Sequence, residues 1–258
     1  DDVLDAIRFR QPGRTPCFAD FTPVKLEEFQ RKTGRDDPQH YFGQGHRVVR
    51  IQAGFGDAVA APGSLADADS TFLKIPTRPT GFHHYLEVLP PMAQFESAGQ
   101  VARYEFPDYT SIFDARRFAE AVSAIQNQGF AAVGNARLVF ILAVYLRGME
   151  RLLCDFYENP QFVEVLLDRL TEMSIFKARA CARAGVDMLF VYEDVATQRG
   201  LLMSPDMWRR WLKPRMQKVI AAAHEIRPEL PVLYDSDGDV TAILDDLQQE
   251  RAEKPLSH

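Results

Sequence analysis

Residues 186–194 read VDMLFVYED, an unbroken apolar run that ends in two acids. A run of this length predicts a strand that is buried on both faces of a parallel sheet. A long helix is predicted before it, because Asn159-Pro160 is a typical helix start and Gly185 a typical helix end. The stretch therefore indicates a helix that leads directly into a central strand.

The same alternation continues on both sides of this stretch. Downstream, SPD at 204–206 predicts a helix start, Pro214 predicts a bend or break in that helix, and PVLYDSD at 231–237 predicts another strand. Upstream, a helix over 116–128 precedes a strand over 130–136. Strands that alternate with helices predict a parallel α/β sheet, either open and doubly wound or closed as a barrel.

The rest of the chain gives weaker signals. Residues 15–21 (TPCFADF) are predicted as the first strand, and residues 24–32 as a helix that ends at Gly34. Residues 54–91 are rich in Gly and Pro, which predicts loops and short strands that cover one end of the body. LAVYLRGMERLLCDFY at 142–157 is predicted as one helix.

Composition narrows the class of protein. The 258 residues are 46% hydrophobic and 26% charged, and the net charge of −6 gives no basic footprint for nucleic acid. No membrane-spanning run and no signal peptide are visible, and Cys17, Cys154 and Cys181 form no metal-binding or disulfide pattern. We expect a cytoplasmic protein with a single domain over 1–258, irregular to about residue 112 and regular from about 113 to 249.

Polar side chains follow the carboxyl ends of three predicted strands, at Asn135, at Glu193-Asp194 and at Asp235-Ser236-Asp237. In open sheets and in barrels alike, these ends carry the chemistry. Residues 235 and 237 point to the same side of a strand, ~7 Å apart. Glu193 and Asp194 point to opposite sides, so only one of them can face a site.

Such a group of acids has several possible roles. It can bind a divalent cation, hold a cationic or hydroxylated ligand, or supply a general acid with a raised pKa. The alternative is an ordinary exposed turn, a role that suits Asp239 well because it precedes the last predicted helix, over 240–249.

Two long segments carry a resemblance to a known family. YEDVATQRGLLMSPDMWRRWLKPRMQKVI at 192–220 and VLYDSDGDVTAILDDL at 232–247 are similar to the C-terminal half of the uroporphyrinogen decarboxylase superfamily. LRGMERLLCDFYENPQFVEVLLDRL at 146–170 resembles the helix pair before them, and GFGDAV at 54–59 resembles an early Gly-x-Asp element of the family.

The resemblance implies a (β/α)8 TIM-barrel fold. The superfamily contains a cofactor-free decarboxylase of haem synthesis and methyltransferases that move methyl groups to or from corrinoid proteins. Those that alkylate thiols use a zinc ion, held by a His-x-Cys strand end and a later cysteine. The methyltransferase branch resembles this chain more closely than the true decarboxylase does.

Three departures qualify what the resemblance implies. The decarboxylase grips substrate carboxylates with a loop after its first strand, whereas RQPGRTP at 10–16 lies before the first predicted strand. The His-x-Cys position reads Asp235-Ser236-Asp237, and carboxylates bind zinc more weakly than imidazole and thiolate do. An eight-fold barrel also needs about two more βα units than the sequence supplies.

We therefore expect a methyltransferase that moves a methyl group between a small methylated substrate, such as a methyl ether, and a corrinoid on a partner protein. The predicted catalytic residues are Glu193, Asp194, Asp235 and Asp237. Three of them, Glu193, Asp235 and Asp237, are also the predicted ligands of a possible zinc ion. The predicted substrate contacts are Gln198, Tyr234, Asp57 and Asn135. One alternative is a decarboxylase of a porphyrinogen-like polycarboxylate, with Arg199 and Arg147 as carboxylate-binding residues. The other is a barrel that binds a ligand without catalysis. No nucleic-acid or membrane partner is expected, and the pattern gives no oligomeric state.

Overall fold

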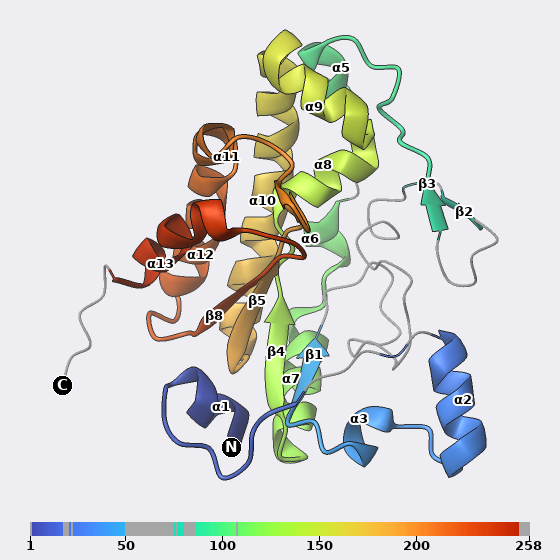
Figure 1. The fold of residues 1–258 in the computed structure, drawn as a ribbon, viewed down its shortest axis with the longest axis vertical. Coiled ribbons are helices and arrows are strands. Elements are labelled where there is room, and N and C mark those ends of the chain that lie inside the picture. The colour runs from blue at the N-terminus through green and yellow to red at the C-terminus, as the bar shows by residue number, and fades with distance from the viewer. Residues whose placement is uncertain are drawn as a thin grey trace.

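The computed structural model of the protein describes residues 2–17, 21, 23–49, 75, 77–79, 86–106 and 108–252. Its centre is a four-stranded parallel sheet, drawn as neighbouring arrows in Figure 1. The strands are β1 (His46–Val49), β4 (Ala131–Asn135), β5 (Met188–Tyr192) and β8 (Val232–Asp235). Their order across the sheet is their order along the chain. Consecutive strands of a barrel have this order, whereas a doubly wound sheet reverses it at a switch point.

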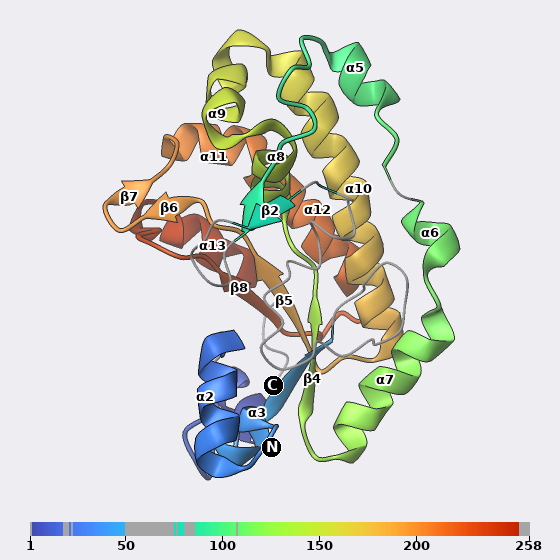
Figure 2. The same ribbon diagram turned by 90° about the vertical axis from the view of Figure 1, so that its right-hand side faces the viewer.

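Three long helices cover one face of this sheet. They are α7 (Ala115–Asn127), α10 (Pro160–Ala184) and α12 (Lys213–His224), and Figure 2 shows α7 and α10 along one side of the strands. Each of the three leads into the next strand of the sheet, so the chain repeats a helix–strand unit. This is the alternation that the sequence predicts.

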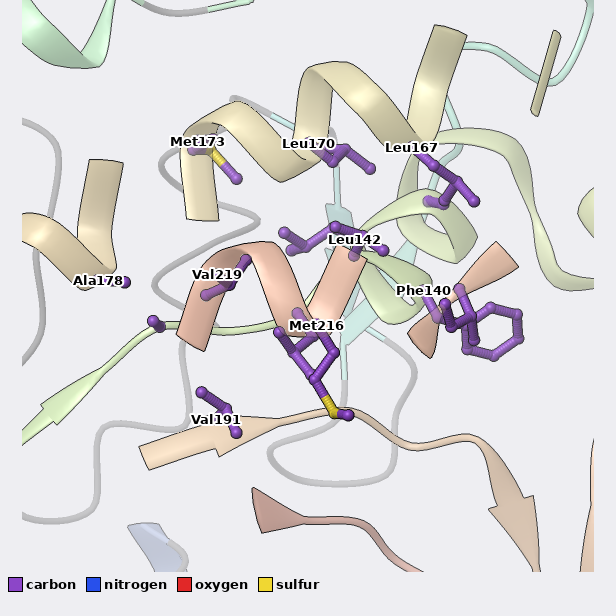
Figure 3. Close-up of a cluster of buried hydrophobic side chains, with 14 of the residues drawn as sticks. Phe140, Leu142, Leu167, Leu170, Met173, Ala178, Val191, Met216 and Val219 are labelled. Atoms are coloured by element: carbon purple, nitrogen blue, oxygen red, sulfur yellow. The ribbon is translucent and has the colours of Figure 1, made fainter. Parts of the chain in front are cut away.

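The hydrophobic core lies between the strands and these helices. In Figure 3, Val191 of β5 faces Met216 and Val219 of α12, while Leu170 and Met173 of α10 border the same cluster. All five side chains are at most 3% exposed. Removing this much apolar surface from water is the main stabilising contribution to such a fold.

Close packing between β4 and α10 shows which side of the sheet the helices cover. A Cβ atom added to Gly134 would lie 2.7 Å from the Cys181 sulfur of α10, so Gly134 faces the helix layer. Side chains alternate along a strand, and the buried Val191 shares the helix side of β5. Phe190 and Tyr192 therefore project from the opposite side, where their rings stack with centroids 6.4 Å apart.

The predicted helix ends are mostly confirmed. α10 follows Asn159 and ends at Gly185, and α11 (Pro205–Trp211) is separated from α12 at Leu212, as Pro214 predicts. The single helix predicted over 142–157 is wrong. The chain instead forms α8 (Val139–Arg147) and α9 (Met149–Glu158), because Gly148 between them adopts a φ of 87° that no helix allows.

The N-terminal part is less regular. Helix α2 (Pro23–Thr33) is confirmed, but the described residues of the predicted first strand, 15–17 and 21, are not in a strand. Most of residues 54–91, the segment predicted to cover one end of the body, lies outside the described residues. The remaining elements of this part are α1 (Asp2–Ile7), α3 (Pro38–Tyr41), the hairpin of β2 (Thr77–Pro79) with β3 (Leu86–Val88), α5 (Ala98–Arg103) and α6 (Tyr109–Ile112).

Short elements follow β5 and β8. After β5 the chain forms a small hairpin of β6 (Ala196–Thr197) and β7 (Gly200–Leu201). After β8 it forms a 3₁₀ turn, η1 (Thr241–Ile243), and helix α13 (Leu244–Ala252). Among the described helices, none is long and apolar enough to cross a membrane.

Candidate functional site at the strand ends

The carboxyl ends of β4, β5 and β8 meet at one edge of the sheet. Asn135 of β4 pairs with Phe190 of β5, and Tyr192 of β5 pairs with Asp235 of β8. Because paired residues share a face, Tyr192 and Asp235 both project away from the helix layer. The sheet therefore brings the carboxyl ends of β5 and β8 together, and Tyr192 and Asp235 lie side by side there.

Hydrogen bonds donated by main-chain N–H groups join the segments that follow β5 and β8. The Glu193 N–H donates to the Asp235 carbonyl at 3.0 Å, and the Asp237 N–H donates to Asp194 Oδ1 at 2.9 Å. The Val195 N–H donates to the Ser236 hydroxyl at 3.3 Å. These bonds fix the loop after β8 against the end of β5, so the acids have set positions rather than those of a free turn.

Gly238 places the same loop against the β6–β7 hairpin. Its φ is +92°, and a Cβ atom there would lie 2.6 Å from the Thr197 carbonyl oxygen. The neighbouring Asp239 N–H donates to that carbonyl at 2.8 Å. Both the left-handed conformation and the lack of space require glycine at this position.

Glu193 points to the helix side of β5 and is 1% exposed. Its Oε1 accepts a hydrogen bond of 2.7 Å from the Phe140 N–H at the start of α8, where Leu138 has no capping side chain. Burial raises the pKa of Glu193 to about 7, although the N–H groups of Phe140 and Val139 lower it in part. The structure thus places Glu193 at a helix start in the protein interior, away from the face that carries Asp235.

Asp194 is the acid of this pair that reaches the loop after β8. Its Oδ1 receives the Asp237 N–H, and its other oxygen accepts a hydrogen bond from the Tyr192 hydroxyl. Burial and the Asp194 carboxylate raise the pKa of Tyr192. The guanidinium of Arg137 lies over the Tyr192 ring, 5.0 Å from its centroid. Sequence reasoning missed Tyr192, which precedes Glu193 in the chain and bonds to Asp194, and Arg137, which contacts the Tyr192 ring.

Asp235 has a pKa above the usual range of an aspartate. Partial burial is the main cause, and the nearby carboxylates of Asp237 and Asp194 add to it. No described residue forms an ion pair with any of these three acids. Their mutual repulsion favours the protonated form of Asp235, which gives it the chemistry of a weak acid near the protein surface.

The predicted substrate contacts are distributed over both faces of the sheet. Tyr234 points to the helix side, where its hydroxyl is buried without a hydrogen bond from any described residue, and burial followed by the Glu193 charge raises its pKa. Gln198 is exposed at the turn between β6 and β7, and Asn135 is partly buried at the end of β4. Asp57 lies outside the described residues. A role in substrate binding stays a prediction for all four.

Comparison with known proteins identifies the family. A family model described as uroporphyrinogen decarboxylase (URO-D) matches residues 88–254, which include β4, β5, β8 and the acids at their ends. The chain belongs to the URO-D family. The predicted resemblance is confirmed.

Two similar proteins are both methyltransferases by name. Over 90 residues the chain is 38% identical to "Methylcobamide:CoM methyltransferase MtaA" of Methanosarcina barkeri, and the aligned part is 35% of this chain and 24% of that protein. The chain therefore spans about a quarter of the length of this curated relative. A solved structure, a methyltransferase from Methanosarcina mazei, has a TM-score of 0.66 at 18% identity, and the match covers 96% of this chain and 72% of that chain. This likeness confirms the predicted barrel-type fold class.

The strand ends of this URO-D protein do not fit the zinc site that the resemblance implies. In the described part of the chain, no group of three or more His, Cys, Asp or Glu side chains is arranged to hold a metal. Glu193 binds the start of α8 and is not brought together with Asp235 and Asp237. The nearby acids are hard oxygen donors, whereas a zinc site that forms thiolates uses sulfur and nitrogen ligands.

Arg147, predicted as a carboxylate-binding residue of a decarboxylase, is 1% exposed. Its guanidinium forms an ion pair with Asp155 at 2.6 Å and donates to the carbonyls of Met92 and Phe95 at 2.5 and 2.7 Å. It therefore stabilises the corner between α8 and α9 and is not available to a substrate. Arg199 is exposed at the turn of the β6–β7 hairpin.

Proposed function

We propose that this URO-D family protein is a methyltransferase that moves a methyl group between a small methylated substrate, such as a methyl ether, and a corrinoid carried by a separate protein. Family membership and the two methyltransferases among the similar proteins support the proposal. The corrinoid supplies the cobalt that exchanges the methyl group. It is a second substrate presented by its partner rather than a resident group of this chain.

The observation that carries the proposal is the Asp235 carboxyl group at the end of β8, with its raised pKa. When a methyl group leaves an ether, the C–O bond breaks and its electron pair stays on the oxygen, which then needs a proton. We assign this proton to Asp235. In the reverse direction, the Asp235 carboxylate takes the proton back from the alcohol.

Asp194 and Asp237 support this role in two ways. Their charges disfavour the ionised form of Asp235, and Asp194 holds the loop through the Asp237 N–H. Tyr192 fixes the Asp194 carboxylate through its hydroxyl, with Arg137 above its ring. Carboxyl, hydroxyl and main-chain groups of this chain supply these roles, and the described side chains do not form a metal site.

The test measures methyl transfer from a panel of methyl ethers to free cob(I)alamin, in the wild type and in Asp235→Ala and Asp237→Ala. Loss of a general acid typically costs 10²–10⁴-fold in rate, so we expect at least a ~100-fold decrease in Asp235→Ala. Asp239→Ala is the matched control, since Asp239 is exposed and caps the Thr241 N–H at 3.0 Å. Circular dichroism verifies that each variant is folded.

Full activity in both Asp235→Ala and Asp237→Ala would refute the proposal. Ultraviolet-visible titrations with a cobalamin and with a porphyrin distinguish a methyltransferase from a decarboxylase. Methyl transfer predicts a spectral change with the cobalamin, while binding of the porphyrin alone would favour decarboxylation. Binding of neither ligand would favour a barrel without catalysis.

A further inference from the structure

Glu193 lies directly behind the acids of the candidate site. The next residue, Asp194, points to the opposite side of β5 and reaches the loop after β8. The Glu193 main-chain N–H donates to the Asp235 carbonyl at 3.0 Å. A displacement of Glu193 would therefore move Asp194 and the end of β8 as well.

The Glu193 side chain holds the start of α8. The first N–H groups of a helix have no partner within it, and Leu138 before α8 supplies no capping side chain. Glu193 Oε1 accepts the Phe140 N–H at 2.7 Å, and the carboxylate is also stabilised by the Val139 N–H. The Phe140 ring is fully buried in the cluster of Figure 3. Glu193 thus caps α8 from another strand and joins that strand to the core.

The same contact helps to place Arg137, which lies between β4 and α8. The main-chain N–H groups on either side of Arg137 donate to carbonyls of β5 at 2.9 and 3.1 Å. Its guanidinium lies over the Tyr192 ring, and the Tyr192 hydroxyl donates to Asp194. The segment from β4 to α8 is thereby joined to β5, and the bond to Glu193 completes this row of contacts.

Glu193 is 1% exposed and points away from the face that carries Asp235, so any role in the reaction must act through other residues. We propose that Glu193 is a positioning residue of the methyl-transfer site. Its carboxyl group anchors the end of β5 to the start of α8, and so keeps Asp194 beside Asp235 and Arg137 over the Tyr192 ring. This role rests on the function proposed above for Asp235.

The first test follows the titration of Asp235 by carbon-13 nuclear magnetic resonance of the aspartate carboxyl groups, with Asp235→Asn to assign the signal. The carboxylates that face Asp235 are those of Asp237 and Asp194. In Glu193→Leu the anchor is lost and Asp194 is held less firmly, so Asp235 should titrate at a lower pH than in the wild type.

Glu193→Gln should leave this titration unchanged. Glutamine keeps an oxygen that accepts the Phe140 N–H. It also matches the uncharged form of Glu193, which burial favours up to a pKa of about 7.

Val139→Pro weakens the anchor from the other side, because it removes one of the two N–H groups. Proline is favoured at the first position of a helix, and Leu138 before it already has an extended backbone. The Asp235 titration should shift in the same direction as in Glu193→Leu.

Methyl transfer to free cob(I)alamin is the second readout. Glu193→Leu should lower kcat about tenfold with KM within about twofold, because misplaced groups slow the reaction more than they weaken binding.

Asp114→Leu is the matched control. Asp114 caps α7 by accepting the Arg117 N–H at 2.9 Å, so this variant removes a capping carboxylate from another helix and should leave the Asp235 titration unchanged. Two outcomes overturn the proposal: an unchanged Asp235 titration in both Glu193→Leu and Val139→Pro, or an equal shift in Glu193→Gln and Glu193→Leu. The carboxyl titration needs no substrate, so it decides the role of Glu193 even if the wild type transfers no methyl group, a result that would refute the proposed function.

Discussion

Asp155 and Glu193 are buried carboxylates in two different regions of this protein, and their surroundings differ. Asp155, in α9, is 1% exposed and pairs with Arg147 at 2.6 Å. Glu193, at the end of β5, is equally buried but has no described cation beside it; it accepts a main-chain N–H instead. In the first region an arginine neutralises the buried carboxylate, whereas in the second no cation among the described residues pairs with it.

The difference indicates what each region does. A buried ion pair holds together the elements that supply its two halves, here the corner of α8 and α9 and the segment 92–95. At the strand ends, burial raises the pKa of Glu193 and of Asp235, and the charges of neighbouring carboxylates add to the effect. Acids whose pKa is raised in this way are typical of sites that move protons, and less so of structural contacts.

Breaking the ion pair should have the largest effect on stability. In Asp155→Asn, Arg147 would stay buried with its charge unpaired, which typically costs about 3–5 kcal/mol. Denaturation by urea measures the free energy of unfolding. The double variant Arg147→Met/Asp155→Leu should recover much of the loss, because it removes both charges. A loss below about 1 kcal/mol in Asp155→Asn would contradict this account of the pair.

Glu193→Gln tests the second region through its pH dependence. The folded pKa of about 7 lies above the ordinary pKa of 4.5, so the folded state holds a proton that the unfolded state releases between these values. Wild-type stability should therefore fall, relative to Glu193→Gln, as pH rises from about 4.5 to 7. The shift corresponds to a difference of about 3 kcal/mol as an upper estimate.

The measurement is the free energy of unfolding of both proteins at pH 5 and at pH 8. Glutamine is the chosen substitution because it keeps an oxygen that can accept a hydrogen bond from the Phe140 N–H. A constant difference between the two proteins at the two pH values would show that Glu193 has an ordinary pKa in the folded protein.

Asp235→Asn should have the smallest effect on stability. Burial and the charges of Asp237 and Asp194 disfavour the ionised form of Asp235, so the amide should leave the free energy of unfolding within about 0.5 kcal/mol or raise it slightly at pH 8. Thermal and urea denaturation both measure this. A loss as large as that of Asp155→Asn would remove the contrast between the two regions.

The sequence predicts the helix–strand units well where local signals are strong. Asn159-Pro160 and Gly185 mark the ends of α10 because capping depends on adjacent residues, and the continuous apolar runs mark β5 and β8. The first strand of the sheet, His46–Val49, is four residues long and has only two consecutive apolar residues, so it gives no such signal. Gly148 breaks a helix whose hydrophobic pattern continues across it.

The candidate site is predicted only in outline. Strand periodicity places Asp235 on one face and separates Glu193 from Asp194, but it cannot say which of the two acids meets the loop. That choice depends on the start of α8, a contact between residues 53 positions apart. The approach of Arg137 to the Tyr192 ring likewise depends on how neighbouring strands end, which no local pattern contains.

The loop after β8 has a further consequence for how this protein can change over evolution. Its shape depends on Gly238, on the Ser236 hydroxyl and on three main-chain bonds to the neighbouring segments, made by the Asp235 carbonyl and by the N–H groups of Asp237 and Asp239. The side chains at 235 and 237 make none of these three bonds. Their identity can therefore change while the backbone keeps its path, so one scaffold can exchange its reactive groups by two substitutions and acquire a different chemistry.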